Sequence, residues 1–398
     1  MKKDKVVLAF SGGLDTSYCI KYLKNELKLD VYSVVVNTGG FDLAELEEIE
    51  ERAYQLGVKE HRSVDEVKNF YQKAIKYLIF GNVLKNNTYP LSVSAERAFQ
   101  AMEVVNFAKE IGAKYLAHGS TGAGNDQVRF DLIFNIMAPD MEILTPIRDQ
   151  KLSRKEEIEY LKKYGVHLPW EQAQYSINKG LWGTSVGGVE TLTSDQPLPA
   201  AAFPSQPIQT EPKDLKLTFQ SGELIAIDDQ IFKPVKAIQE LEKIASQYAV
   251  GQDIHTGDTI IGTKGRVGFE AAAPLIIIKA HHTLEKHCLT KWQLYWKDQL
   301  ANWYGMLLHE GQYLDPVMRN IEKFMEDSQK NVEGDVTVQL SPYQFRILGI
   351  SSEHDLMNPE FGHYGEMNNA WTGEDVKGFT KILANQSKIY HLTNHSDL

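Results

Sequence analysis

A short run of small and hydroxyl residues near the start of the chain has the chemistry to bind a phosphate. Ala9-Phe10-Ser11-Gly12-Gly13-Leu14-Asp15-Thr16-Ser17 follows the apolar run Val6-Val7-Leu8 and precedes a helical pattern. A buried strand that ends in such a turn presents backbone N–H groups at a helix N-terminus, where an anion is favoured. No lysine follows the glycines, so the loop is not of the G-x-x-x-x-G-K-[ST] type. The alternative is an ordinary glycine turn before a helix that Thr16 or Ser17 caps.

A second polar stretch, from Gly119 to Phe130, is the densest cluster of functional groups in the chain. It combines three glycines with Thr121, Asn125, Asp126 and Arg129. The carboxylate of Asp126 could hold a substrate ammonium, and the guanidinium of Arg129 could hold a carboxylate or a polarised carbonyl. The alternative is a solvated loop with Asx turns.

The elements that must position these residues alternate between strands and helices. Apolar strand-like runs at 6–9, 31–36 and 115–117 alternate with helical patterns at 43–56 and 95–111. Buried strands joined by helices indicate a parallel sheet, and ligands bind beyond the carboxyl ends of such strands. We therefore expect the Ser11 loop, Asn37-Thr38-Gly39-Gly40 and His118-Gly119-Ser120-Thr121 to converge on one crevice.

The pattern changes after a helical segment at 153–164, which ends at Gly165 with Pro169 just beyond it. We predict an α/β protein with a nucleotide-binding domain at 1–168, a second α+β domain at 169–370 and a C-terminal helical tail at 371–398. Within the second part the expected elements are a long surface loop at 192–214, a strand at 215–219, a helix at 234–248, a hairpin at 259–269, mostly long helix from 274 to about 329, a hairpin at 336–348 and an amphipathic segment at 375–391.

Composition narrows the class of protein. The chain has 398 residues, a net charge of −11, 42% hydrophobic residues and 24% charged residues. Such an acidic chain is not expected to bind nucleic acid. Its two cysteines, Cys19 and Cys288, exclude a disulfide framework and indicate reduced thiols in a cytoplasmic protein. The most apolar stretch, 271–278, is too short to cross a membrane, so no membrane association is expected.

Two other groups of residues are not expected to form a functional site. His281, His282 and His287 lie on different faces of a helical pattern, so we expect no metal site there. The aromatic residues between Trp292 and Tyr304 recur at helical spacing and are expected to pack in the core or at a subunit interface.

The two polar stretches together resemble known sequences. The Ser11 loop resembles the pyrophosphate loop of the N-type ATP pyrophosphatases, whose domain is of the adenine nucleotide alpha hydrolase type. Gly119-Ser120-Thr121-Gly122-Ala123-Gly124-Asn125-Asp126-Gln127-Val128-Arg129-Phe130 looks like the Gly-x-Thr-Gly-Lys-Gly-Asn-Asp-Gln-x-Arg-Phe-Glu signature of argininosuccinate synthases. The segments 89–97 and 176–185 resemble two further substrate segments of that family, in the same order along the chain.

This resemblance implies an enzyme that uses magnesium-bound ATP to join citrulline to aspartate through citrullyl-AMP, as part of arginine biosynthesis. It implies a homotetramer in which the C-terminal helix is exchanged between subunits. Asp15, Asp126 and Arg129 are the implied catalytic residues, and no metal ligand is assigned. The implied contacts are, for the nucleotide, Ala9, Phe10, Ser11, Gly12, Gly13, Leu14, Asp15, Thr16, Ser17, Val36 and Gly119; for aspartate, Thr121, Asn125 and Asp126; and for citrulline, Tyr89, Ser94, Asn125, Arg129, Ser176 and Ser185.

The chain departs from the family pattern at three positions. Ala123 stands where the pattern has lysine, so another cation or a second metal is expected to replace it. Gly257 and Phe269 stand where the pattern has a glutamate and a tyrosine that contact citrulline. Either Asp258 or another carboxylate reaches the same space, or the substrate is an Nα-acylated citrulline, which needs no counter-ion for an ammonium.

Three other functions are possible in principle. A tRNA-modifying thiolase would need sulfur-carrying cysteines and a basic surface. An amidotransferase would need a glutaminase domain, for which the chain has no room, and its position 2 is lysine. A non-catalytic nucleotide-binding module would not need Asp15, Asp126 and Arg129 together.

Overall fold

A computed structural model describes residues 3–167, 175–357, 360, 362–366 and 370–394 of the chain. The chain divides into two compact units, Met1–Glu353 and His354–Leu398, which are described separately below. Pro169, which helped to predict the domain boundary, lies outside the described residues. In the described part of the chain, no helix is both long and apolar enough to cross a membrane.

The N-terminal part of the first unit is built on a five-stranded sheet in the order β3-β2-β1-β4-β5. Every neighbouring pair is parallel. The three strands predicted from apolar runs are confirmed, and the two edge strands were not predicted because they lack such runs. The strands are β1 (Lys5–Ala9), β2 (Asp30–Asn37), β3 (Glu60–Asp65), β4 (Tyr115–Ala117) and β5 (Glu142–Leu144).

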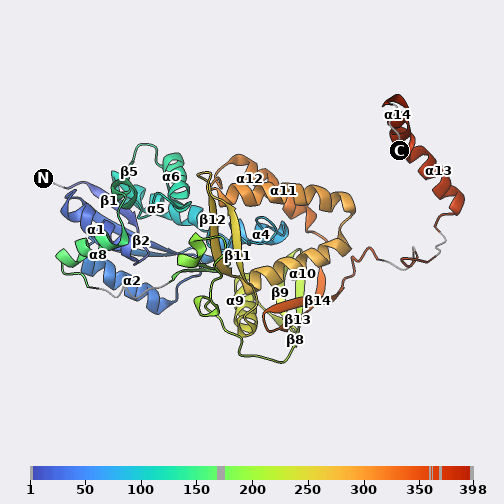
Figure 1. Ribbon diagram of the computed structural model, residues 1–398, viewed down its shortest axis with the longest axis horizontal. Coiled ribbons are helices and arrows are strands. Elements are labelled where there is room, and N and C mark those ends of the chain that lie inside the picture. The colour runs from blue at the N-terminus through green and yellow to red at the C-terminus, as the bar shows by residue number, and fades with distance from the viewer. Residues whose placement is uncertain (1–2, 168–174, 358–359, 361, 367–369, 395–398) are drawn as a thin grey trace. The chain divides into compact units, whose positions relative to one another are not determined.

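Helices cover both faces of this sheet (Figure 1). On one face α1 (Leu14–Asn25), α2 (Leu43–Leu56) and α8 (Arg154–Lys163) bury Cys19, Ile49 and Leu161 against the strands. On the other face lie α5 (Arg97–Ile111) and α6 (Asp126–Met137), with the short helix α7 (Pro146–Gln150) between α6 and α8 in the chain. The helices α2 and α8 begin where the capping boxes of Asp42 and Ser153 satisfy backbone N–H groups.

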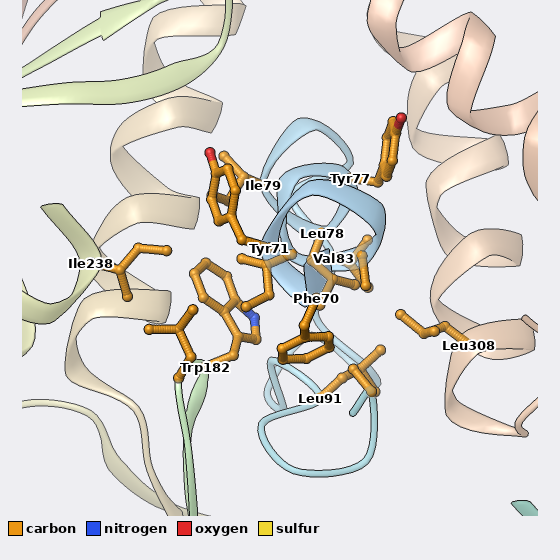
Figure 2. Close-up of a cluster of buried hydrophobic side chains, with 14 of the residues drawn as sticks. Phe70, Tyr71, Tyr77, Leu78, Ile79, Val83, Leu91, Trp182, Ile238 and Leu308 are labelled. Atoms are coloured by element: carbon orange, nitrogen blue, oxygen red, sulfur yellow. The ribbon is translucent and has the colours of Figure 1, made fainter. Parts of the chain in front are cut away.

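The segment between β3 and α5 inserts into the centre of the first unit. It contains α3 (Val67–Phe70), a π-helical turn (Tyr71–Ile75) and α4 (Lys76–Phe80). In Figure 2, Ile238 of α9 (Pro234–Ala245) and Leu308 of α11 (Lys291–His309) lie on opposite sides of this segment, and Trp182 lies beside Phe70. One continuous core therefore joins residues from both sides of the predicted boundary near 168.

The second half of the first unit contains two antiparallel sheets, in the orders β10-β9-β8-β13-β14 and β11-β12-β7-β6. The strand at 215–219 and the hairpin at 336–348 are confirmed within β8, β13 and β14. The strands are β6 (Ser176–Gly180), β7 (Gly183–Gly187), β8 (Lys213–Gln220), β9 (Glu223–Ile227), β10 (Gln230–Ile231), β11 (Gln252–Asp258), β12 (Lys264–Glu270), β13 (Gly334–Ser341) and β14 (Gln344–Ser351).

Three expected elements in this half are confirmed in type but differ in their bounds. The hairpin predicted at 259–269 spans 252–270, and Thr259–Thr263 form its turn. The long helix predicted from 274 is three helices: α10 (Ala272–Cys288), α11 and α12 (Pro316–Ser328). Thr290 and Asp315 cap the second and third of these, and Pro316 at the first helical position cannot continue a preceding helix. The helix predicted at 234–248 ends at Ala245, where a 3₁₀ turn follows.

The second unit is small and helical. The segment predicted at 375–391 forms two helices, α13 (Gly373–Leu383) and α14 (Asn385–Asn394). Their apolar side chains are exposed within the chain, among them Phe379, Ile382 and Leu392. Exposed apolar surface also occurs on α11 of the first unit, where Trp292 and Trp296 lie outside the core and Tyr304 is buried.

Candidate active site

A cavity of about 1260 Å³ opens at the carboxyl ends of the parallel strands. The three polar loops that follow β1, β2 and β4 all line it, so the predicted convergence is confirmed. The β11–β12 hairpin and the β6–β7 hairpin complete its wall. Gly12 and Ser17 do not line the cavity, whereas the other candidate residues do: Ala9, Phe10, Ser11, Gly13, Leu14, Asp15, Thr16, Val36, Tyr89, Ser94, Gly119, Thr121, Asn125, Asp126, Arg129, Ser176 and Ser185.

The Ser11 loop is held in shape from behind. Gly12 has a φ of +76°, and a Cβ at this position would lie 3.1 Å from Ile49 of α2. Arg52 of α2 donates to the Gly12 carbonyl over 2.6 Å. These contacts place Gly12 against α2 and turn Ser11 and Gly13 toward the cavity.

The start of α1 differs from the capped helix considered above. Gly13 is the N-cap residue, and no side chain caps the first turn. The hydroxyl of Ser17 donates to the Gly13 carbonyl over 2.7 Å, and that of Thr16 does so over 3.3 Å. The capping alternative is therefore wrong. The N–H groups of the first turn are left without a side-chain acceptor, as an anion site requires.

Gly119 allows β4 and α1 to approach each other closely. A Cβ there would lie 3.0 Å from Thr16 Cγ2 and 3.2 Å from the Thr16 backbone nitrogen. Any side chain at position 119 would push against the first turn of α1, so a glycine is needed to bring the two loops together.

An alternating row of charged side chains crosses the floor of the cavity. Arg97 donates to Glu96 over 2.6 Å and to Asp126 over 2.9 Å, and Arg129 donates to Asp126 over 2.6 Å. The Nε of Arg129 also donates to the His309 carbonyl over 2.7 Å. Each charge thus has a partner of opposite sign, which makes the row rigid enough to orient a ligand.

The acidity of Asp126 limits what this carboxylate can do in a reaction. Burial alone would raise the pKa of this carboxyl, but the charges and hydrogen bonds of Arg97 and Arg129 lower it well below its usual range. A carboxylate of such low basicity is a poor proton acceptor. Asp126 is therefore suited to orienting an ammonium or amine rather than to taking its proton.

The remaining expected residues come from the β6–β7 hairpin and from the segments that precede α5 and α6. Asn125 Oδ1 accepts from the Ile260 backbone N–H over 2.8 Å and so holds the turn of the β11–β12 hairpin. Tyr89 is buried, with its ring stacked on His255 at 5.2 Å between ring centroids. Ser94 donates to the Leu91 carbonyl over 3.2 Å. Ser185 lies in β7 opposite Phe269 of β12, and Ser176 begins β6.

The positions that depart from the family pattern have clear surroundings. A Cβ at Gly257 would lie 2.5 Å from His255 Nε2, so the His255 ring occupies the space beside this glycine. Asp258 pairs with Lys264 over 2.5 Å, and its side chain is 68% exposed. Phe269 is fully buried beneath Tyr89 and does not line the cavity. The Asp258 carboxylate is therefore engaged at the rim.

An acidic pair lies beside the Ser11 loop. Asp15 interacts directly with Glu157 of α8, and Arg154 of the same helix is close to both. Burial and the Asp15 charge raise the pKa of Glu157 to about 8, and burial raises that of Asp15. Glu157 Oε2 is buried without a hydrogen-bond partner. Arg154 lines the cavity near the Ser11 loop. This is where a cation would have to lie to replace the lysine that the family pattern has at position 123.

Sequence reasoning missed several residues of the cavity. Arg97, His255 and His309 line it, and Lys85 contacts it through His309. Arg97 stands within the segment 89–97 that resembles a substrate segment, which was a signal for it. The two histidines stand in unrelated patterns, and only the fold brings His255 and His309 together.

Comparison with known proteins gives one consistent result. The family models "Arginosuccinate synthase N-terminal HUP domain" and "Arginosuccinate synthase C-terminal domain" match residues 5–167 and 175–390. The chain belongs to the argininosuccinate synthase family. As a member of this family it is a ligase, with the α/β fold expected of it.

Individual relatives match over nearly their whole length. The chain is 36% identical over 395 residues to the argininosuccinate synthase of Dictyoglomus thermophilum, which covers 98% of both chains. It is 35% identical over 389 residues to that of Methanocaldococcus jannaschii, covering 97% of this chain and 98% of the relative. It is 36% identical over 406 residues to the argininosuccinate synthase of Xanthomonas campestris, covering 99% of this chain and 100% of the relative.

Proposed function

We propose that this protein condenses a citrulline with aspartate, in arginine biosynthesis, using ATP. The ureido oxygen attacks the α-phosphorus of ATP, the bond to the β-phosphate oxygen breaks, and pyrophosphate leaves. The amine of aspartate then attacks the ureido carbon of citrullyl-AMP and loses a proton, and the bond from that carbon to the AMP oxygen breaks. The products are argininosuccinate and AMP.

The observation that carries this proposal is the convergence of two chemically different sites in one cavity. The uncapped first turn of α1 and the backbone at Val36 and Gly119 suit a nucleotide and its phosphates. The row from Arg97 to Arg129 suits zwitterionic or carboxylate substrates. Holding three reactants in one cavity replaces two bimolecular encounters with steps between bound groups.

Specific side chains are assigned from the family resemblance, and each of them lines the cavity. Asp126, with Thr121 and Asn125, orients the amine of aspartate. Arg129 holds the polarised ureido oxygen, and Tyr89, Ser94, Ser176 and Ser185 surround the citrulline chain. Their positions on the cavity wall support these assignments.

Magnesium is proposed as the cofactor, delivered with ATP. In the described part of the chain, no three His, Cys, Asp or Glu side chains form a metal set. The crowded pair Asp15 and Glu157, with an unpartnered buried oxygen, fits a hard cation that prefers oxygen ligands. Bound there, magnesium would neutralise charge on the phosphates.

The alternative functions have less support. Cys19 and Cys288 are both buried cysteines that do not line the cavity, so neither is placed to carry sulfur for a thiolase. Cysteines in the thiol state also agree with a cytoplasmic location, which we propose on that ground. The exposed apolar side chains of α11 and α13 support assembly into a homotetramer.

The test is release of AMP and pyrophosphate from Mg-ATP, measured with and without aspartate and a citrulline. The proposal expects both products only when all three substrates are present. Pyrophosphate release that does not depend on a citrulline would contradict it in favour of an ATP pyrophosphatase with another acceptor, and ATP binding without turnover would contradict it in favour of a nucleotide-binding module.

A further inference from the structure

The end of the cavity beside β11 has a different chemistry from the rest. His255 and His309 line it, and each residue is only 6% exposed. Burial, with the nearby charges of Arg129 and Lys85, holds the pKa of His309 well below its usual range. Burial, with the charge of Lys85, lowers that of His255 as well. Both imidazoles are therefore neutral at pH 7.

The contact with Lys85 decides where the His309 proton lies. Lys85 Nζ lies 3.0 Å from His309 Nδ1, and an ammonium can only donate. Nδ1 is therefore the acceptor, and a neutral imidazole must then carry its proton on Nε2. None of the described residues accepts from Nε2 of His309. An N–H donor of a cavity-lining residue thus remains for whatever occupies this end of the cavity.

The charges around these histidines are mainly positive. Lys85 forms no ion pair with any described residue, and Arg129 completes the positive side. The nearest acidic groups already have partners: Asp258 pairs with Lys264, Glu310 accepts from Gln312 over 3.0 Å and interacts with Lys85, and Asp253, near His255, accepts from the Ile254 backbone N–H. Asp126 is shared by two arginines.

A free α-ammonium does not suit these surroundings. It is a donor that carries positive charge, so it would meet another donor and the field of two cations without an uncommitted carboxylate. An amide at the same position is neutral, and its carbonyl oxygen can accept from His309 Nε2. Gly257, which has no side chain, leaves this end free of a counter-ion.

We infer that the substrate's α-nitrogen is acylated: the protein takes an Nα-acylated citrulline, and His309 donates to an oxygen of its acyl-amide end. This assignment rests on the proposed function. His309 is a specificity-determining residue, and Lys85 is a positioning residue that keeps its proton on Nε2. The oxygen belongs either to the amide carbonyl or to a carboxylate on the acyl group.

The test compares citrulline, Nα-acetylcitrulline and Nα-succinylcitrulline, with AMP release from Mg-ATP and aspartate as the rate. We expect kcat/KM for an acylated form to exceed that for citrulline by about 10-fold or more, the size of one charge-assisted or buried hydrogen bond. If both acylated forms are preferred equally, the oxygen that accepts from His309 is the amide carbonyl. If only the succinyl form is preferred, this oxygen belongs to the carboxylate of the acyl group. Equal or better use of free citrulline overturns the inference.

Variants separate recognition from folding. His309→Phe keeps a ring but removes the donor, and we expect it to lose the preference for the acylated form. Lys85→Met should reduce the preference in a pH-dependent way, because the His309 pKa then rises, and Lys85→Arg should restore it. The control is Lys76→Met, which removes a half-buried lysine paired with Glu326 outside the cavity and should leave the preference unchanged.

Binding measured by calorimetry without ATP makes the two proposals distinguishable. If no form releases AMP but the acylated forms bind more tightly than citrulline, and His309→Phe removes the difference, the proposed reaction fails and the subsite stands. If citrulline binds more tightly, or His309→Phe weakens all three forms equally, the subsite assignment fails whether or not AMP is released.

Discussion

The two ends of the cavity recognise their ligands by different means. At the Ser11 end the groups offered are backbone N–H groups at the start of α1, and Gly12, Gly13 and Gly119 make room for them. At the β11 end the groups offered are the side chains of His255 and His309. Backbone recognition requires a particular local sequence, whereas side-chain recognition requires only that distant residues meet. Substrate choice can therefore change at the second end while the first stays the same.

The largest expected effect on activity comes from breaking the row of charged side chains between the two ends of the cavity. Arg129→Met should lower kcat/KM for the citrulline substrate by about 10²- to 10³-fold, because it removes a charged donor from the reacting group. Steady-state kinetics with saturating ATP and aspartate measure it. Arg346→Met is the control, since Arg346 contacts Gln339 on the surface of β14. A loss of less than threefold would show that Arg129 has no part in the reaction.

A side chain at position 119 should damage the nucleotide end selectively. Gly119→Val would push its Cβ and methyl groups against Thr16 and displace the first turn of α1. We expect KM for ATP to rise by about 10- to 100-fold, the cost of misplacing a binding loop by about 1 Å. Gly349→Ala, where a Cβ meets no atom within 4 Å, is the matched control. An equal rise in KM for aspartate would contradict a selective effect.

A carboxylate at position 257 should change ligand recognition at the β11 end of the cavity and leave the Ser11 end unchanged. Gly257→Glu would displace the His255 ring and supply a counter-ion for an ammonium. We expect the ratio of kcat/KM values for acylated over free citrulline to fall by about 10-fold, equivalent to about 1.4 kcal/mol. KM for ATP should stay within twofold. If Gly257→Glu unfolds and loses activity with all substrates, the milder variant Gly257→Ser would be measured in its place.

The smallest expected effect concerns stability at the Ser11 end. The pKa of Glu157 is raised to about 8 in the folded protein, against 4.5 in an unfolded chain. The folded state therefore binds a proton that the unfolded state releases between these values, so this group lowers stability as pH rises from about 4.5 to about 8. Glu157→Gln cannot ionise and should lack this loss.

Thermal unfolding of both proteins at pH 5, 6.5 and 8 measures this effect. The variant's Tm relative to wild type should increase from pH 5 to pH 8, in the absence of magnesium and ATP. Asp131→Asn, which removes a carboxylate that pairs with His118 and Arg148 instead, is the comparison. A difference between Glu157→Gln and wild type that does not vary with pH would contradict the raised pKa.

Local sequence determined most of the scaffold at the Ser11 end. The apolar runs of β1, β2 and β4, the glycines after them, and the capping boxes of α2 and α8 are signals within a few residues of one another. Strand and helix formation follow from such local patterns, so the parallel sheet and the convergence of its loops could be predicted. The edge strands β3 and β5 could not be predicted. An edge strand is more exposed to solvent than a central strand, so its sequence contains fewer apolar residues in a row.

Only the tertiary structure decided the β11 end. Lys85, His255 and His309 are separated by more than fifty residues in each case, and although Gly257 and the segment 89–97 stand near two of them, no pattern marks these three residues themselves as one site. The same holds for Glu157, whose raised pKa arises from burial and from contact with Asp15. Hydrogen-bond direction, proton position and acidity depend on distances between groups that the chain brings together only by folding. The sequence thus determined which chemistry is available, and the packing of distant segments decided which groups face the substrate.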